Sequence, residues 1–265
     1  MYGALLGDMI GSPYEFDRSG KTKDFPLFKK GSVFTDDSVM TIAVAEALMD
    51  SMGKGEEETK AALVASMQKW GHLEPDAGYG GMFHRWLASE DPQPYGSYGN
   101  GSAMRVSSAG WLYDTVEETQ EKARWTAEVT HNHEEGIRGA ECIATLIFNA
   151  RQGDSKKQLR DWARLVYDYR IHSCDFIRPR YHHVESCQET VPPAIAAFLE
   201  GESFEDVIRT AVSLGGDCDT LTCIAGSMAE AFYGVPEELK AECRKRLTPE
   251  MLKLLDRFEG LRKGS

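Results

Sequence analysis

Apolar residues recur with the three- to four-residue spacing of helices along most of the chain, and alternating runs rich in β-branched residues are nearly absent. Residues 38–50 are apolar almost all round, which predicts a buried helix. The same spacing predicts further helices over residues 117–128, 135–149, 191–199, 204–214, 220–233 and 249–258. The fold class is therefore predicted to be all-α.

Polar residues mark the starts of three of these segments. Thr115, Ser203 and Thr248 each precede a helical pattern, where a hydroxyl can accept a hydrogen bond from a free N–H group. Three long segments interrupt the pattern, and loops of such length in a compact domain are usually functional or mobile. They cover residues 17–34, 90–101 and 171–186.

The organisation of the chain predicts one domain over residues 1–265, a compact helical bundle. No Pro- or Gly-rich linker divides the sequence, and no repeat of fixed period occurs in it. The most apolar stretch, residues 39–49, is interrupted by Glu46 and is too short to cross a membrane. The first residues lack the basic start of a signal peptide. We therefore expect a cytoplasmic protein with no membrane partner. We also expect it to act as a monomer.

Charge and cysteine content narrow the function further. The formal net charge is −12, which argues against a nucleic-acid partner because sequence-independent binding needs a cationic surface. The six cysteines form no C-x-x-C pair and no zinc-like spacing, so we expect buried, reduced thiols. An acidic protein can still hold an anionic ligand if metal ions supply positive charge locally.

Two short acidic motifs stand at the starts of predicted buried helices. Either motif alone has an ordinary explanation, because Asp and Thr favour helix N-termini as caps. A cap needs one acceptor, however, whereas each motif offers three oxygen ligands, and unpaired buried carboxylates are costly without cations. The two motifs together predict an all-oxygen site for hard divalent ions, two Mg²⁺ or Mn²⁺. The candidate ligands are Thr35, Asp36, Asp37, Asp217, Asp219 and Thr220.

A glycine-rich run from residue 96 to residue 105 predicts a loop that holds an anion. Its glycines would let backbone N–H groups approach a diphosphate closely, although an ordinary Gly-rich turn has the same composition. The segment G-Y-G-G at residues 78–81 repeats the theme. The candidate ligand-binding residues are Gly80, Gly81, Ser97, Tyr98, Gly99, Asn100 and Gly101.

Two single residues complete the candidate site. His131 follows a predicted helix, where a histidine is more often a capping or packing residue than a ligand contact. Glu15 closes the first helical segment and opens the 17–34 loop. A lone glutamate is by default a solvated surface charge.

Taken together, these segments resemble the ADP-ribosylglycohydrolase family, which includes the dinitrogenase-reductase activating glycohydrolases. The pairing of F-T-D-D-S-V-M-T at residue 34 with G-G-D-C-D-T-L-T-C-I-A-G at residue 215 is highly specific. The run S-Y-G-N-G-S-A-M-R-V from residue 97 is most similar to the branch that contains the serine-ADP-ribose hydrolases. Residues 171–186 match no motif of the family that we can place.

The resemblance implies an all-α enzyme with two Mg²⁺ or Mn²⁺ ions at its centre, held by the six oxygen ligands named above. Residues 97–101 would cradle the diphosphate of ADP-ribose, His131 would contact the distal ribose or the phosphates, and Glu15 would lie on a movable loop beside the metals. The substrate would be an ADP-ribosylated protein or a small ADP-ribose conjugate.

The expected reaction is hydrolysis at the anomeric carbon of the distal ribose. Such cleavage needs acid and base carboxyl groups, and Glu15 and Asp36 are the candidates, with Glu15 preferred. The leaving group would be an arginine nitrogen or a serine oxygen. Two other functions stay open: a metal-dependent phosphohydrolase, although no histidine accompanies the aspartates, and a non-catalytic ADP-ribose or nucleotide-binding protein, although no expected ligand is missing.

Overall fold

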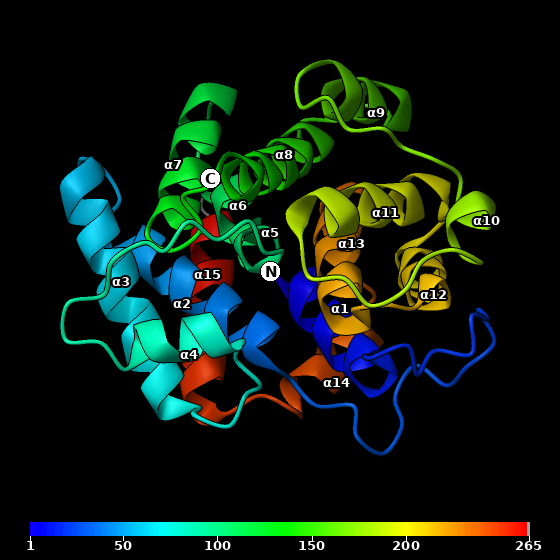
Figure 1. Cartoon of the computed structure of the whole chain (residues 1–265), viewed down its shortest axis with the longest axis horizontal. Coiled ribbons are helices and arrows are strands. Elements are labelled where there is room, and N and C mark those ends of the chain that lie inside the picture. Colours follow the sequence, from blue (N-terminus) through cyan, green and yellow to red (C-terminus); the bar gives the residue numbers. More distant parts are fainter. Residues whose placement is uncertain (264–265) are drawn as a thin grey trace.

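The computed structural model describes residues 1–263, and these form a bundle of α-helices without a β-strand, which confirms the predicted fold class (Figure 1). Two single-turn 3₁₀ helices cover Ser12–Tyr14 and Val106–Ser108. The α-helices are α1 (Tyr2–Gly11), α2 (Asp36–Asp50), α3 (Glu56–Leu73), α4 (Gly81–Leu87), α5 (Gly101–Met104), α6 (Ala109–Leu112), α7 (Val116–Glu128), α8 (Glu134–Arg151), α9 (Lys156–Leu165), α10 (Cys174–Ile177), α11 (Cys187–Glu200), α12 (Phe204–Leu214), α13 (Cys218–Tyr233), α14 (Glu237–Arg244) and α15 (Pro249–Lys263).

Every helix predicted from apolar spacing is present, and the differences lie mainly at the ends. Helix α12 has the predicted bounds, while α2 and α13 begin earlier because the acidic motifs form their first turns. The three predicted hydroxyl caps accept hydrogen bonds from helix N–H groups. Helices α3, α9 and α14 were not predicted, because many of their residues are charged and few are buried. The 171–186 segment is not wholly irregular, since it contains α10.

The centre of the molecule is the contact between α1 and α13, which lie side by side (Figure 1). A Cβ atom placed on Gly3 would lie 2.1 Å from the carbonyl oxygen of Gly226, and one on Gly7 would lie 2.2 Å from that of Thr222. A Cβ on Gly11 would lie 2.5 Å from the oxygen of Cys218. Glycines spaced four residues apart on α1 therefore let the two backbones touch along their lengths.

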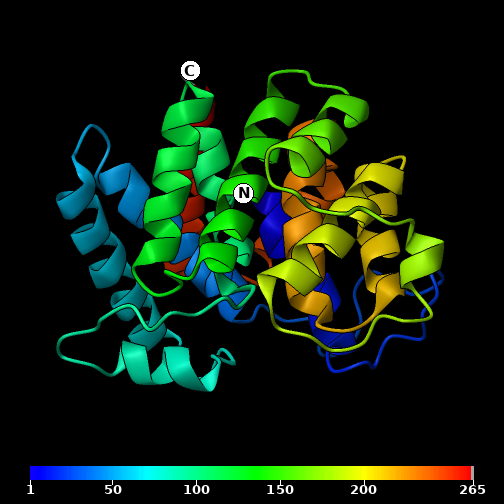
Figure 2. The same cartoon turned by 45° about the horizontal axis from the view of Figure 1, so that its top comes forward.

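The remaining helices surround this pair and enclose one core. Helix α2 packs against α1, against α3 on its outer side and against α15, while α11 and α12 pack against α13. Figure 2 shows α7 and α8 side by side as well. As a result, the N-terminal ends of α2 and α13 meet beside the C-terminal half of α1.

The state of the cysteines and the polarity of the helices agree with what the sequence predicts. All six cysteines are buried free thiols, as expected. Within residues 1–263, no helix is both long and apolar enough to cross a bilayer.

The tight contact between α1 and α13 generates a prediction. Gly7→Ala places a methyl group against the α13 backbone, which cannot yield as a side chain can, so we expect the free energy of unfolding to fall by about 1–3 kcal/mol or more. Gly260→Ala in α15 is the matched control, since a Cβ there has no atom within 4 Å and alanine favours a helix. Urea unfolding of both variants measures the effect, and equal stability of the two would contradict it.

Candidate active site

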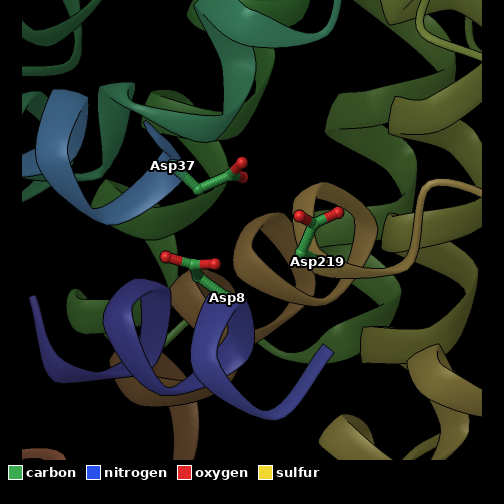
Figure 3. Close-up of side chains that lie close together, drawn as sticks. All are labelled: Asp8, Asp37 and Asp219. Carbon is green, nitrogen blue, oxygen red and sulfur yellow. The ribbon is translucent and has the colours of Figure 1, made fainter. Parts of the chain in front are cut away.

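Three buried carboxylates from three different helices meet where α1, α2 and α13 converge. Figure 3 shows Asp8 of α1, Asp37 of α2 and Asp219 of α13 facing one another. One oxygen from each lies within 4.8 Å of the other two. The first turns of α2 and α13 also point the positive ends of their helix dipoles toward this cluster.

The Asp8 carboxylate holds the start of α2 in place. It accepts hydrogen bonds from the Thr35 N–H (2.9 Å), the Thr35 hydroxyl (2.8 Å) and the Ser38 N–H (3.0 Å), and the Ser38 hydroxyl also donates to it. Because these bonds fix the loop-to-helix turn, Asp8 sets the position of the neighbouring Asp37. Sequence reasoning did not include Asp8 in the site.

Asp37 has a free oxygen that fits a cation. Its Oδ2 accepts a hydrogen bond from the Thr220 hydroxyl (3.1 Å), but its buried Oδ1 has no hydrogen-bond partner. A buried carboxylate oxygen without a partner is costly, and a hard cation among carboxylate and hydroxyl oxygens removes that cost. The donor set therefore fits Mg²⁺ or Mn²⁺ chemistry.

A second cluster adjoins the first and contains Glu15. Oxygens of Glu15, Asp217 and Asp219 lie within 4.8 Å of one another, so Asp219 belongs to both clusters. Asp217 occupies the N-cap position of α13 without a capping hydrogen bond, and its carboxylate accepts a hydrogen bond from the Asn100 side chain (2.6 Å). This bond ties the glycine-rich loop directly to the acidic motif.

Burial and mutual repulsion raise the pKa values throughout these clusters. Burial, followed by the charge of Asp217, raises the pKa of Glu15 to about 7, and burial raises the pKa of Asp8 to about 6 despite its hydrogen bonds. Burial and neighbouring carboxylates raise the pKa values of Asp37 and Asp219 well above the ordinary range. The cluster is thus poised to bind protons or, more favourably near neutral pH, cations.

Two of the predicted metal ligands differ from the others. The Thr35 hydroxyl donates to Asp8 and caps α2, accepting from the Asp37 N–H, and Thr35 does not line the cavity described below. Asp36 does line this cavity, but its carboxylate belongs to neither cluster. It lies near Gly78, where an added Cβ atom would be 3.8 Å from the Asp36 Oδ1. Burial, followed by the charge of Asp8, raises the pKa of Asp36 to about 8.

One cavity of about 960 Å³ opens over both clusters, a volume suited to a nucleotide-sized ligand. Of the residues predicted from the sequence to form the site, all except Thr35 line this cavity. They come from segments as distant in the chain as Glu15 and Thr220, so the fold brings the predicted motifs together.

The glycine-rich loop has fewer free N–H groups than its sequence suggested. The Gly96 N–H donates to Asn132, the Gly99 N–H to the Ser97 hydroxyl, and the Asn100 N–H to the Glu185 carbonyl. These bonds hold the loop in shape rather than serving an anion. His131 is buried beside the loop, and a Cβ on Gly101 would lie 3.1 Å from its Nε2.

The turn after Glu15 is fastened to the second acidic motif. Phe16 and Asp17 have φ values of 56° and 59°, a left-handed conformation that is strained for these residues. The Asp17 carboxylate accepts hydrogen bonds from the N–H groups of Gly216 (3.1 Å) and His183 (3.1 Å). Glu15 is thereby held next to Asp217.

Sequence reasoning missed residues that line or support the cavity. His183 lines it and packs its ring 4.9 Å from the ring of Phe16, so the unassigned 171–186 segment does reach the site. Asp8 had a visible signal, since it is the sole charged residue of α1. Arg105 had a weaker one, as part of the glycine-rich run.

Comparisons with known proteins agree with the fold and the motifs. ADP-ribosylhydrolase ARH3 from Homo sapiens is 27% identical over 320 residues, covering 91% of this chain and 87% of the relative. The ADP-ribosyl-dinitrogen reductase glycohydrolase of Rhodospirillum rubrum is 25% identical over 260 residues, covering 89% and 84%. A solved ADP-ribosylglycohydrolase-related protein complex shares the fold, with a TM-score of 0.70 at 23% identity over 98% of this chain and 93% of that one.

The sequence model of the ADP-ribosylglycohydrolase family matches residues 1–265. This match covers the whole chain, and it includes both acidic motifs and the glycine-rich loop. The chain therefore belongs to the ADP-ribosylglycohydrolase family and is an ADP-ribosyl hydrolase, as its motifs predicted.

Proposed function

We propose that the chain hydrolyses the bond between the anomeric carbon of the distal ribose and an acceptor, with the clusters around Asp219 as the reaction centre. The observation that carries the proposal is the placement of Glu15 beside Asp217 and Asp219, on the wall of the one cavity that the predicted motifs share. Water supplies the hydroxyl group to the anomeric carbon, and the acceptor leaves with a proton.

Two divalent cations, Mg²⁺ or Mn²⁺, are part of this proposal. Asp37, Asp217 and Asp219 would be the main ligands, because Asp219 shares one cluster with Asp37 and the other with Asp217, and Asp37 has an unpartnered oxygen. Thr35, Asp36 and Thr220 would complete the ligand set. When bound, such ions supply positive charge that orients the ribose hydroxyls and polarises the region of the scissile bond.

Glu15 is the proposed acid–base residue. Its half-buried carboxylate lines the cavity beside Asp217 and Asp219, and burial raises its pKa in the metal-free protein to about 7, which favours the uptake of a proton. Glu15 would take the proton from the attacking water. Asp36 is the second candidate because it lines the same cavity and its pKa is also raised.

Substrate binding would involve the glycine-rich loop and its surroundings. Residues 97–101, together with Gly80 and Gly81, would hold the diphosphate, and His131 would contact a ribose or phosphate oxygen. We further propose one domain over residues 1–265, because helices from both ends of the chain pack around α1 and α2. We also propose that it acts as a monomer. The rival functions lack comparable support, since the relatives are hydrolases of ADP-ribose linkages.

Removing divalent metal tests the cation sites. Exhaustive chelation should abolish turnover and lower the melting temperature, because the buried carboxylates lose their compensating charge. Adding back Mg²⁺ or Mn²⁺ should restore both. Full turnover in chelator, with the absence of metal confirmed by elemental analysis, would contradict the proposal.

Replacing Glu15 separates chemistry from binding. Glu15→Gln keeps the size and removes the charge, so kcat should fall at least about 100-fold while ADP-ribose affinity changes only a few-fold. Asp217→Asn should weaken both, since Asp217 is a proposed metal ligand. Glu74→Gln is the matched control, since Glu74 is a half-buried glutamate that does not line the cavity. Single-turnover rates and calorimetry decide, and an equal loss of rate and affinity in Glu15→Gln would show a ligand-holding role instead.

The linkage that the enzyme prefers is a further prediction. The run from Ser97 to Val106 resembles the serine-hydrolase branch, so we expect O-linked ADP-ribose to be cleaved faster than arginine-linked ADP-ribose. The test compares kcat/KM for serine- and arginine-linked conjugates of one peptide. Faster cleavage of the arginine conjugate would reverse this expectation.

A further inference from the structure

Arg105 is a buried cation without an acidic partner. The residue ends the glycine-rich run, is 1% exposed and lines the cavity. The Nη2 group donates to the Thr126 carbonyl (2.9 Å) and to the Thr130 hydroxyl (2.6 Å), while Nε has no hydrogen-bond partner. Among the described residues no carboxylate forms an ion pair with Arg105. Keeping a guanidinium in this position is costly, which points to a role for its charge and its donors.

Thr130 connects Arg105 to His131. The Thr130 Oγ1 lies 2.6 Å from the His131 Nδ1. A guanidinium can only donate hydrogen bonds, so the Thr130 oxygen must accept from Arg105. Its own hydrogen is then free to point at Nδ1, and no other acceptor for it exists among the described residues. In this arrangement Nδ1 accepts a hydrogen bond, and the ring proton is on Nε2.

The opposite tautomer is disfavoured by the same contacts. A proton on Nδ1 would turn that nitrogen into a donor, and the Thr130 hydroxyl would receive two donors while its own hydrogen stayed buried and unpaired, which costs free energy. A doubly protonated ring would meet the same difficulty. Burial, together with the charge of Arg105, also holds the pKa of His131 well below its usual range.

The Nε2 atom of His131 faces the glycine-rich loop. A Cβ atom on Gly101 would lie 3.1 Å from Nε2, and one on Gly99 would lie 3.4 Å from it. Glycine at both positions keeps this side of the ring open. Three N–H groups of the loop donate within the protein, so an additional donor from outside the loop would serve an anion there.

We infer that Arg105 and Thr130 are positioning residues that fix the proton of His131 on Nε2, so that the ring donates a hydrogen bond to a phosphate or ribose oxygen held at the glycine-rich loop. The inference rests on the proposed function for the identity of that ligand. The hydrogen-bond chain itself is a property of the ligand-free protein.

Nitrogen NMR of histidine side chains tests the tautomer directly. In protein labelled with ¹⁵N-histidine, His131 should show an unprotonated Nδ1 and a protonated Nε2, with the assignment made from the signals lost in His131→Gln. Thr130→Val keeps the shape and removes the hydroxyl, so the two nitrogens should shift toward a tautomer mixture. Thr130→Ser should restore the wild-type pattern. A protonated Nδ1 in the wild-type protein would overturn the inference without any variant.

Ligand binding tests the purpose of the arrangement. Thr130→Val should weaken ADP-ribose binding about tenfold, whereas Thr130→Ser should bind within about threefold of wild type. Thr119→Val is the matched control, a buried threonine of α7 whose hydroxyl has no partner, and it should change neither the tautomer nor the affinity. Unchanged affinity in a Thr130→Val protein with an altered tautomer would overturn the ligand-donor role.

The two proposals fail in different ways. A protein that turns over no ADP-ribose conjugate, yet shows the protonated Nε2 and its loss in Thr130→Val, would overturn the proposed function and support the hydrogen-bond chain. If the Thr130→Val variant cleaves conjugates at the normal rate and binds ADP-ribose with wild-type affinity, the inference is overturned and the proposed function still stands.

Discussion

The backbone contact between α1 and α13 determines where the chemistry can occur. A Cβ atom on Gly3, Gly7 or Gly11 would lie within 2.5 Å of a carbonyl oxygen of α13, so at these positions the backbones of the two helices are in direct contact. Asp8 lies in α1 next to the first turn of α2. Its carboxylate fixes that turn by accepting hydrogen bonds from the Thr35 and Ser38 N–H groups. The acidic motif of α2 is therefore placed against that of α13.

Keeping several charged carboxylates buried close together costs free energy unless a cation compensates their charge. Burial and mutual repulsion raise their pKa values, and Asp37 keeps one oxygen without a partner. The same features make the cluster a good host for hard cations, and in the metal-free protein they raise the pKa of Glu15 to about 7. Strain at Phe16 and Asp17 is consistent with a turn held for function, since Asp17 fastens it beside the second motif.

The sequence predicted those parts of the site that local patterns encode. The two acidic motifs and the glycine-rich run could be found because each combines several functional residues in a short segment. Asp8 was visible as the sole charged residue of α1, but the sequence could not show its role, since that depends on a partner 27 residues away and on the contact with α13. Similarly, His131 could be suspected from its neighbours, but its link to Arg105 arises from packing across 25 residues. Polar surface helices such as α9 were missed because helix propensity without a broad apolar face is a weak signal.

The place where α1, α2 and α13 converge is the proposed two-cation site. A crystal structure of the protein grown with Mn²⁺, with diffraction recorded at the manganese absorption edge, measures this most directly. We expect two anomalous peaks within the cluster, contacted by Asp37, Asp217 and Asp219. A map with no peak at these carboxylates, or with manganese bound only elsewhere on the protein, would contradict it.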